Sequence, residues 1–95
     1  MRRIARVDAN QPDITEGLRK VGATVQLLHI IGDGCPDMLV GYHGVNYLLE
    51  IKDGDKPPSQ RQLTDDEMKW FNKWRGKCAV VNNLDEALEY IGATR

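Results

Sequence analysis

The stretch DMLVGYHGVNYLLEIK, residues 37–52, decides the fold. Two runs rich in β-branched, aromatic and other apolar residues flank His43-Gly44, and a glycine in such a short connection is typical of the tight turn between antiparallel strands. We therefore expect one strand over residues 37–42, a second over residues 45–52, and a hairpin formed by the two.

The register of this hairpin predicts a cluster of polar side chains. A two-residue turn pairs Tyr42 with Val45, and counting outward from that pair places Asp37 opposite Glu50. Directly opposed residues have Cβ atoms about 4.5–5.5 Å apart. Lys52 lies two positions beyond Glu50 and points to the same face of the sheet. Asp37, Glu50 and Lys52 should therefore meet at the open end of the hairpin, whereas a shift of one residue would send Asp37 to the other face.

Two opposed carboxylates and a lysine suit one kind of chemistry in particular. The carboxylates repel each other unless a cation neutralises them, and Mg²⁺ prefers hard oxygen ligands of this type. A bound divalent ion activates water and polarises a phosphoryl oxygen, and Lys52 would orient the attacking water or offset charge on the phosphate. The pattern favours metal-assisted phosphodiester hydrolysis. The alternative is that these charged residues only solvate the ends of their strands.

The segment before the hairpin predicts a helix and another strand. Asp13 and Glu16 have the spacing of a capping box, which indicates a helix over residues 14–21 that ends at Gly22. The apolar and β-branched run over residues 24–31 is typical of a strand.

The segment after the hairpin predicts a loop, two helices and a strand. The expected elements are an exposed loop over residues 53–62, a helix that begins with a capping box at Thr64 and Glu67 and continues to Arg75, a buried strand over residues 78–81, and a helix capped by Asn83 that continues to Ile91. We expect an α/β fold with a mixed sheet flanked by helices, formed by one small domain over residues 1–95, of which residues 1–11 form an extended arm.

Composition narrows the functional classes. The chain has 95 residues, of which 41% are hydrophobic and 28% are charged, as is ordinary for one globular domain. No apolar run predicts a membrane span or an export signal, and two cysteines are too few for a disulfide framework, so we expect a cytoplasmic protein. The formal net charge of −1 gives no positive indication of nucleic acid, but basic residues clustered on one face could still bind it.

Several short motifs carry a family resemblance. Pro36-Asp37 followed by Glu50-Ile51-Lys52 resembles the signature of the PD-(D/E)xK nucleases. The segments GCPD at 34–37 and LEIKDG at 49–54 are more narrowly similar to its VRR-NUC (virus-type replication-repair nuclease) branch. The stand-alone phage and bacterial members of that branch also resemble this chain in KPPS at 56–59, Leu63-Thr64, WRG at 74–76 and LDEA at 84–87. The resemblance extends from about residue 17 to residue 92.

The resemblance implies a restriction-endonuclease-like αβββαβ core and a metal site. The Mg²⁺ or Mn²⁺ ion would be held by Asp37, Glu50 and the main-chain carbonyl of Ile51, with Lys52 as the catalytic lysine. A glutamate of the first helix often completes the family's site, and Glu16 is the best match here. Glu16 is equally well explained as the capping residue of that helix.

One position departs from the family pattern. The family has a glutamine three residues after the threonine that opens the second helix, and this chain has Glu67 there. A glutamate can accept a hydrogen bond as a glutamine does, but its charge is unfavourable beside a phosphate. Glu67 is more simply explained as the capping-box partner of Thr64, which leaves a catalytic role for it doubtful.

The resemblance also implies partners and a source. Stand-alone members are similar to Holliday-junction resolvases and act on branched DNA as homodimers, so we expect branched or duplex DNA and a second copy of the chain as partners, and a host-bacterial or phage-encoded cytoplasmic protein. Basic residues outside the site are candidates for phosphate contacts: Lys56, Arg61, Arg2, Arg3 and Arg6. Two alternatives are a DNA-binding or assembly module with weak or no activity, and a structural domain without a nucleic-acid role.

Overall fold

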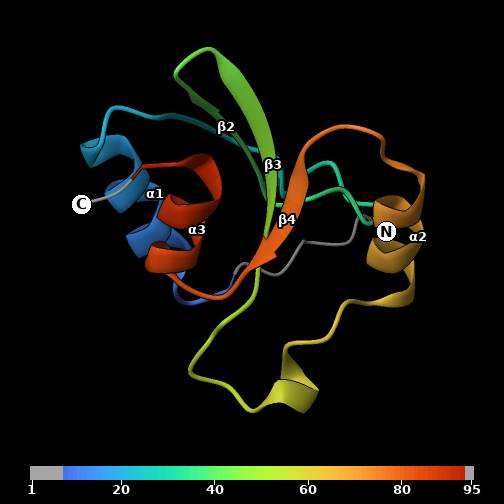
Figure 1. Cartoon of the computed structure of the whole chain (residues 1–95). Helices are drawn as coiled ribbons and strands as arrows, with labels where there is room; N and C mark the ends of the chain where they lie inside the picture. Colours follow the sequence, from blue (N-terminus) through green and yellow to red (C-terminus); the bar gives the residue numbers. More distant parts are fainter. Residues whose placement is uncertain (1–7, 94–95) are drawn as a thin grey trace.

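The computed structural model describes residues 8–93 and has a mixed four-stranded sheet with three α-helices, which confirms the predicted small α/β fold (Figure 1). The elements follow one another as α1 (Gln11–Lys20), β1 (Thr24–Leu27), β2 (Met38–Tyr42), β3 (Val45–Ile51), a short 3₁₀ helix (Pro58–Gln60), α2 (Asp65–Lys73), β4 (Cys78–Val81) and α3 (Leu84–Ile91). This order of helices and strands agrees with the order expected from the sequence.

The sheet has the spatial order β1-β2-β3-β4, and its central hairpin has the predicted register. Tyr42 pairs with Val45 across the turn, and Met38 pairs with Leu49 at the other end of the ladder. The turn residues His43 and Gly44 have φ angles of 48° and 79°, which suits a tight turn whose twist matches that of the strands. β1 is antiparallel to β2, whereas β4 is parallel to β3 and reaches it through the connection that contains α2.

The hydrophobic core lies between one face of the sheet and the helices α1 and α3, which pack side by side on that face (Figure 1). Its largest fully buried side chains on helices and strands are Ile14, Leu18, Met38, Val40, Leu49 and Ile51. Successive residues of a strand point to opposite faces, so Glu50, which lies between Leu49 and Ile51, points away from this core. The polar end of the hairpin therefore belongs to the face opposite α1 and α3.

The first helix begins earlier than the sequence suggested, and the capping box expected there is wrong. α1 begins at Gln11, so Asp13 and Glu16 are both inside the helix, and the N-cap residue Asn10 forms no side-chain capping bond. Proline lacks an N–H and has a helical φ, so Pro12 fits the first turn of a helix and lets it begin before Asp13. The extended arm expected over residues 1–11 consequently overlaps the helix at Gln11, and residues 1–7 lie outside the described part of the chain.

The strand expected over residues 24–31 is also too long. β1 ends at Leu27, and the residues that follow form turns in which Ile30 and Ile31 are 69% and 57% exposed. Beyond the Leu27–Met38 pair, the Leu28 N–H still bonds the Asp37 carbonyl, but the Ile31 N–H turns back to the Leu28 carbonyl at 2.9 Å. The expected strand is cut short because the chain turns after Leu28.

The bounds of the remaining elements agree with expectation to within a few residues. The strand over residues 78–81 was expected to be buried, and this is wrong: Val81 is buried but Val80 is 36% exposed, because β4 is the edge strand of the sheet. Thr64 and Glu67 form the predicted capping box, and α2 ends at Lys73 rather than Arg75. Asn83 caps α3, and the loop over residues 53–62 is largely exposed. Over residues 8–93, no helix combines the length and the apolar character that crossing a bilayer requires.

Candidate functional site

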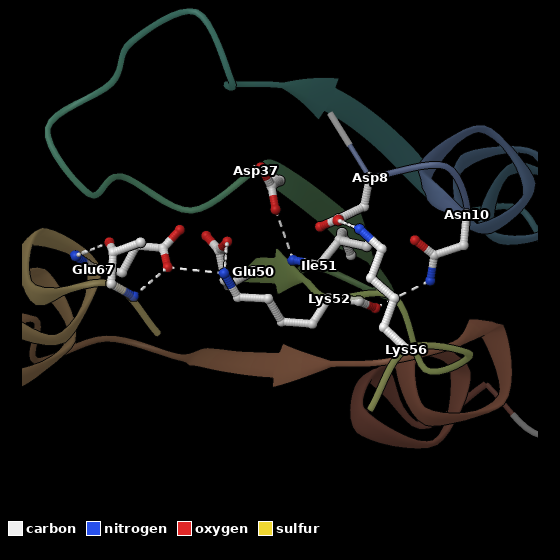
Figure 2. Close-up of polar contacts among 9 residues, drawn as sticks. Asp8, Asn10, Asp37, Glu50, Ile51, Lys52, Lys56 and Glu67 are labelled. Atoms are coloured by element: carbon white, nitrogen blue, oxygen red, sulfur yellow. Dashed lines mark hydrogen bonds and ion pairs between the residues drawn. The ribbon is translucent and has the colours of Figure 1, made fainter. Parts of the chain in front are cut away.

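Asp37 and Glu50 come together at the open end of the β2–β3 hairpin, as the register predicted. Asp37 lies just before β2, where its carbonyl accepts a hydrogen bond from the Leu28 N–H at 2.8 Å. Its Oδ2 accepts one from the Ile51 N–H at 2.7 Å, which fixes the carboxylate against the end of β3 (Figure 2). Burial raises the pKa of Asp37, and the negative charges of Asp8 and Glu67 add to the rise, against the lowering effect of the bond from Ile51.

Glu50 has a more deeply buried side chain than Lys52 or Glu67. Its residue is 3% exposed, its Oε2 lies 3.5 Å from the Lys52 Nζ, and its Oε1 is buried without a hydrogen-bond partner among residues 8–93. Burial, and then the charge of Asp37, raise the pKa of Glu50 to about 10. The Lys52 ammonium lies near Oε2, whereas Oε1 has lost water without gaining a partner in the described structure, so the ionised form of Glu50 is costly unless a further cation reaches Oε1.

Lys52 extends from the end of β3 toward the same face. Its backbone N–H donates to the Val81 carbonyl at 2.9 Å, and its Nζ lies 2.9 Å from the Glu67 Oε1. The side chain is only 12% exposed. Burial alone would lower the pKa of Lys52, but Glu67 and Glu50 outweigh burial and raise it, so the ammonium stays charged.

Glu67 forms the predicted capping box and also contacts Lys52, while a catalytic role for it stays a prediction. Its Oε1 accepts from the Thr64 N–H at 2.8 Å as the capping-box residue, and the same oxygen binds Lys52 (Figure 2). Burial alone would raise its pKa, but hydrogen bonding with Glu50, Lys52 and the Thr64 backbone lowers it. The loop before Asp37 packs against this turn, since a Cβ on Gly34 would overlap the Asp66 carbonyl. Glu67 therefore lies in the site, whatever its chemical role.

Asp8 is a residue of the site that the sequence did not reveal. Asn10 Nδ2 donates to the carbonyls of Lys52 and Asn82, at 3.1 and 3.0 Å, and so fastens the chain before α1 to the end of β3. This brings the charge of Asp8 close enough to Asp37 to raise its pKa (Figure 2). The link joins residues 42 positions apart in the chain, and no local pattern could have indicated it.

The other predicted site residues are more dispersed. Glu16 forms an ion pair with Lys20 at 3.3 Å, with its side chain 68% exposed, and the structure does not bring it into the group of Asp37, Glu50 and Lys52. A metal-binding or catalytic role for Glu16 stays a prediction, and its exposed ion pair with Lys20 does not support it. The backbone N–H of Ile51 binds Asp37, and a metal-binding role for its carbonyl stays a prediction.

The predicted DNA-contact residues are only partly described. The Lys56 Nζ lies 3.8 Å from the Asp8 Oδ1, and its carbonyl accepts from the Arg61 Nε at 2.7 Å, so both basic residues belong to the exposed loop that adjoins the site. Arg2, Arg3 and Arg6 lie outside the described residues.

The donor set fits a small oxygen-bound cation in part. Among residues 8–93, no group of three or more His, Cys, Asp and Glu side chains is arranged to hold a metal ion. Asp37 and Glu50 supply two carboxylates, and the free Glu50 Oε1 is an oxygen that a cation would satisfy. Comparisons with protein-family models, curated proteins and solved structures give no match to this chain.

Proposed function

We propose that this protein is a metal-dependent DNA endonuclease that hydrolyses phosphodiester bonds. The observation that carries the proposal is Glu50, a buried carboxylate beside Asp37. Its Oε1 has no partner in the described part of the chain, and its pKa is raised to about 10. Lys52 pairs with one Glu50 oxygen, Oε2, and a second oxygen that is buried and unsatisfied is typical of a position that a bound ligand completes.

The roles of the residues follow from their contacts. Asp37 and Glu50 hold Mg²⁺ or Mn²⁺, which supplies Lewis-acid stabilisation to the phosphoryl group when bound. The bond from the Ile51 N–H fixes Asp37 Oδ2, and the carboxylate would bind the ion through its other oxygen. Lys52, kept protonated by Glu67 and Glu50, donates to the attacking water or to a phosphate oxygen.

A preference for branched DNA such as Holliday junctions, and action as a homodimer, belong to the same proposal and rest on the family resemblance. Paired active sites would cut a junction at two symmetric positions. The apolar side chains of Met68 and Trp74, 51% and 45% exposed on and directly after α2, are compatible with a contact between copies. A monomeric mass in light scattering, at micromolar protein with DNA present, would contradict the dimer.

A cleavage assay with a lysine variant tests the proposal. Four-way junction, flap and linear duplex DNA are incubated with Mg²⁺ or Mn²⁺ and either the wild type or Lys52→Ala. We expect the wild type to cleave and the variant to lose about 10²–10³-fold in rate, the scale of removing one transition-state donor. Lys77→Ala, a change at an exposed lysine that precedes β4, should cleave as the wild type does.

The outcomes separate the proposal from its alternative. Equal cleavage by wild type and Lys52→Ala would contradict the assigned site. One other candidate function is a DNA-binding or assembly module with weak or no activity. The Glu67–Lys52 ion pair favours it, because Glu67 holds the ammonium group that the enzyme would need for the attacking water or the phosphate. Binding of these DNAs without cleavage in either metal would support the module and refute the enzyme.

A further inference from the structure

The first turn of α2 is attached to the polar end of the hairpin, although the helix adds nothing to the hydrophobic core. None of the residues of α2 is buried. Its first turn contacts the loop that carries Gly34, where a Cβ would overlap the Asp66 carbonyl. The same turn contacts β3, because Glu67 binds the Lys52 ammonium (Figure 2). Core packing therefore does not explain why this helix presents a carboxylate to the end of β3.

The Lys52 ammonium lies between two carboxylates and is closer to the one on α2. Its Nζ is 2.9 Å from the Glu67 Oε1 and 3.5 Å from the Glu50 Oε2. The first distance is that of a charge-assisted hydrogen bond, whereas the second is longer than such bonds usually are. The Glu67 Oε1 also accepts from the Thr64 N–H at 2.8 Å. The cap of α2 therefore fixes the point to which the ammonium is drawn.

The free oxygen of Glu50 shows what this arrangement leaves open. An ammonium group has more than one donor and is carried on a flexible stem, so Lys52 is suited to bind both oxygens of a carboxylate as near as Glu50. The Glu50 Oε1 nevertheless has no partner among residues 8–93. The shorter bond to Glu67 accounts for this, because it directs the ammonium away from Glu50. An oxygen that is buried and unsatisfied then remains for a divalent ion.

We propose that Glu67 is a positioning residue that holds Lys52 off Glu50 and thereby keeps Glu50 open to the divalent ion. This inference rests on the proposed function and assigns to Glu67 a role that differs from that of a metal ligand. The ammonium and the ion are both cations and compete for the same carboxylate. Without the negative charge of Glu67, Lys52 turns to Glu50 and occupies the oxygens that the ion needs.

Two other roles for Glu67 lead to different behaviour. If Glu67 were itself a ligand, its loss would weaken ion binding whether or not Lys52 is present. If it acted only as a distant negative charge, any carboxylate in the first turn of α2 would have the same effect. A positioning role alone makes the effect of Glu67 depend on Lys52, and a double-mutant cycle measures that dependence.

Calorimetric titration with Mn²⁺ is carried out on the wild type, Glu67→Gln, Lys52→Met and the double variant. Glutamine keeps an acceptor for the Thr64 N–H, so the cap of α2 is retained. Glu67→Gln should weaken Mn²⁺ binding about tenfold, the scale of exchanging a charge-assisted hydrogen bond for a neutral one. The same change should alter it by less than about threefold in the Lys52→Met background. Asp65→Asn, which removes a charge at an exposed residue of the same turn, should bind as the wild type does.

A crystal structure of Glu67→Gln in EDTA tests the inference without the ion. It should place the Lys52 Nζ within hydrogen-bond distance of both Glu50 oxygens. An ammonium still directed to the side chain at position 67 would overturn the inference, and so would an effect of Glu67→Gln that is absent or equal with and without Lys52.

The proposed function and the inference fail in different ways. Mn²⁺ affinities that follow the expected cycle, without cleavage of DNA in Mg²⁺ or Mn²⁺, would refute the nuclease and leave the role of Glu67 standing. Mn²⁺ binding by the wild type that Glu67→Gln leaves unchanged would refute the role of Glu67 alone. No Mn²⁺ binding by the wild type would overturn the inference together with the cation site.

Discussion

The helices α2 and α3 have the same kind of N-terminal cap but differ in how much of their surface they bury. Each has a glutamate at the third helical position, Glu67 in α2 and Glu86 in α3, and each N-cap side chain accepts a bond from that residue's N–H. α3 buries Ala87, Leu88 and Ile91 against the core, whereas α2 buries none of its residues. Figure 1 shows α3 beside α1 and α2 on the other side of the sheet. The comparison teaches that α3 stabilises the fold, and that α2 positions a carboxylate beside Lys52.

The largest expected effect is on stability, from truncating one helix and not the other. Leu88→Ala, at a side chain that is 3% exposed, should lower the free energy of unfolding by about 2–5 kcal/mol. Met68→Ala, at a residue of α2 that is 51% exposed, should change it by less than about 1 kcal/mol. Urea denaturation of the two variants measures both values. Equal losses would show that α2 belongs to the core.

The next effect concerns pH and Glu50. Because the pKa of Glu50 is raised in the folded protein, Glu50 keeps its proton there at pH values where the unfolded chain, with a Glu50 pKa near 4.5, has released it. This stabilisation is complete below that value and is lost as the pH rises toward about 10. Glu50→Gln mimics the protonated form, so without divalent ions it should be more stable than the wild type at pH 8, by about 1 kcal/mol or more.

Urea denaturation at pH 5 and pH 8 in EDTA measures this difference for Glu50→Gln. Glu89→Gln, at an exposed glutamate of α3, should follow the wild type at both pH values. A Glu50→Gln variant that is less stable than the wild type at pH 8 would show that Glu50 is ionised and paired in the folded protein.

The smallest expected effect is on the pKa of Lys52, and it should differ between variants of Glu67 and Glu86, the glutamates in the first turns of α2 and α3. Glu67→Gln keeps an acceptor for the Thr64 N–H, so its free energy of unfolding should change by less than about 1 kcal/mol. It removes a negative charge 2.9 Å from the Lys52 Nζ, so the pKa of Lys52 should fall. In Glu86→Gln, whose oxygen accepts from the Asn82 N–H, the pKa of Lys52 should stay as in the wild type. NMR titration of the lysine Nζ compares them, and the same Lys52 pKa in both variants would refute the coupling.

The sequence predicted those contacts of the site that form between residues close in the chain. It did not predict the contacts between residues that are distant in the chain. The turn at His43-Gly44 fixes the hairpin register, and the register is sufficient to bring Asp37 toward Glu50. Glu67 was recognised as a capping residue, but its bond to Lys52 depends on how α2 lies against the sheet.

The start of the chain shows the opposite case. The spacing of Asp13 and Glu16 resembled a capping box, but Pro12 allows the helix to begin before it, which left Glu16 in an exposed ion pair with Lys20. Asp8 was missed because Asn10 attaches it to β3 through a contact distant in sequence.

The central claim is that Asp37 and Glu50 form a cation site, and a calorimetric titration with Mn²⁺ tests it most directly. The wild type should bind Mn²⁺ at one site per chain, and Asp37→Asn and Glu50→Gln should each abolish that binding while remaining folded by circular dichroism. Glu16→Gln, at the exposed glutamate of α1, should bind as the wild type does. Unchanged Mn²⁺ binding in Asp37→Asn and Glu50→Gln, or no binding by the wild type, would contradict the account.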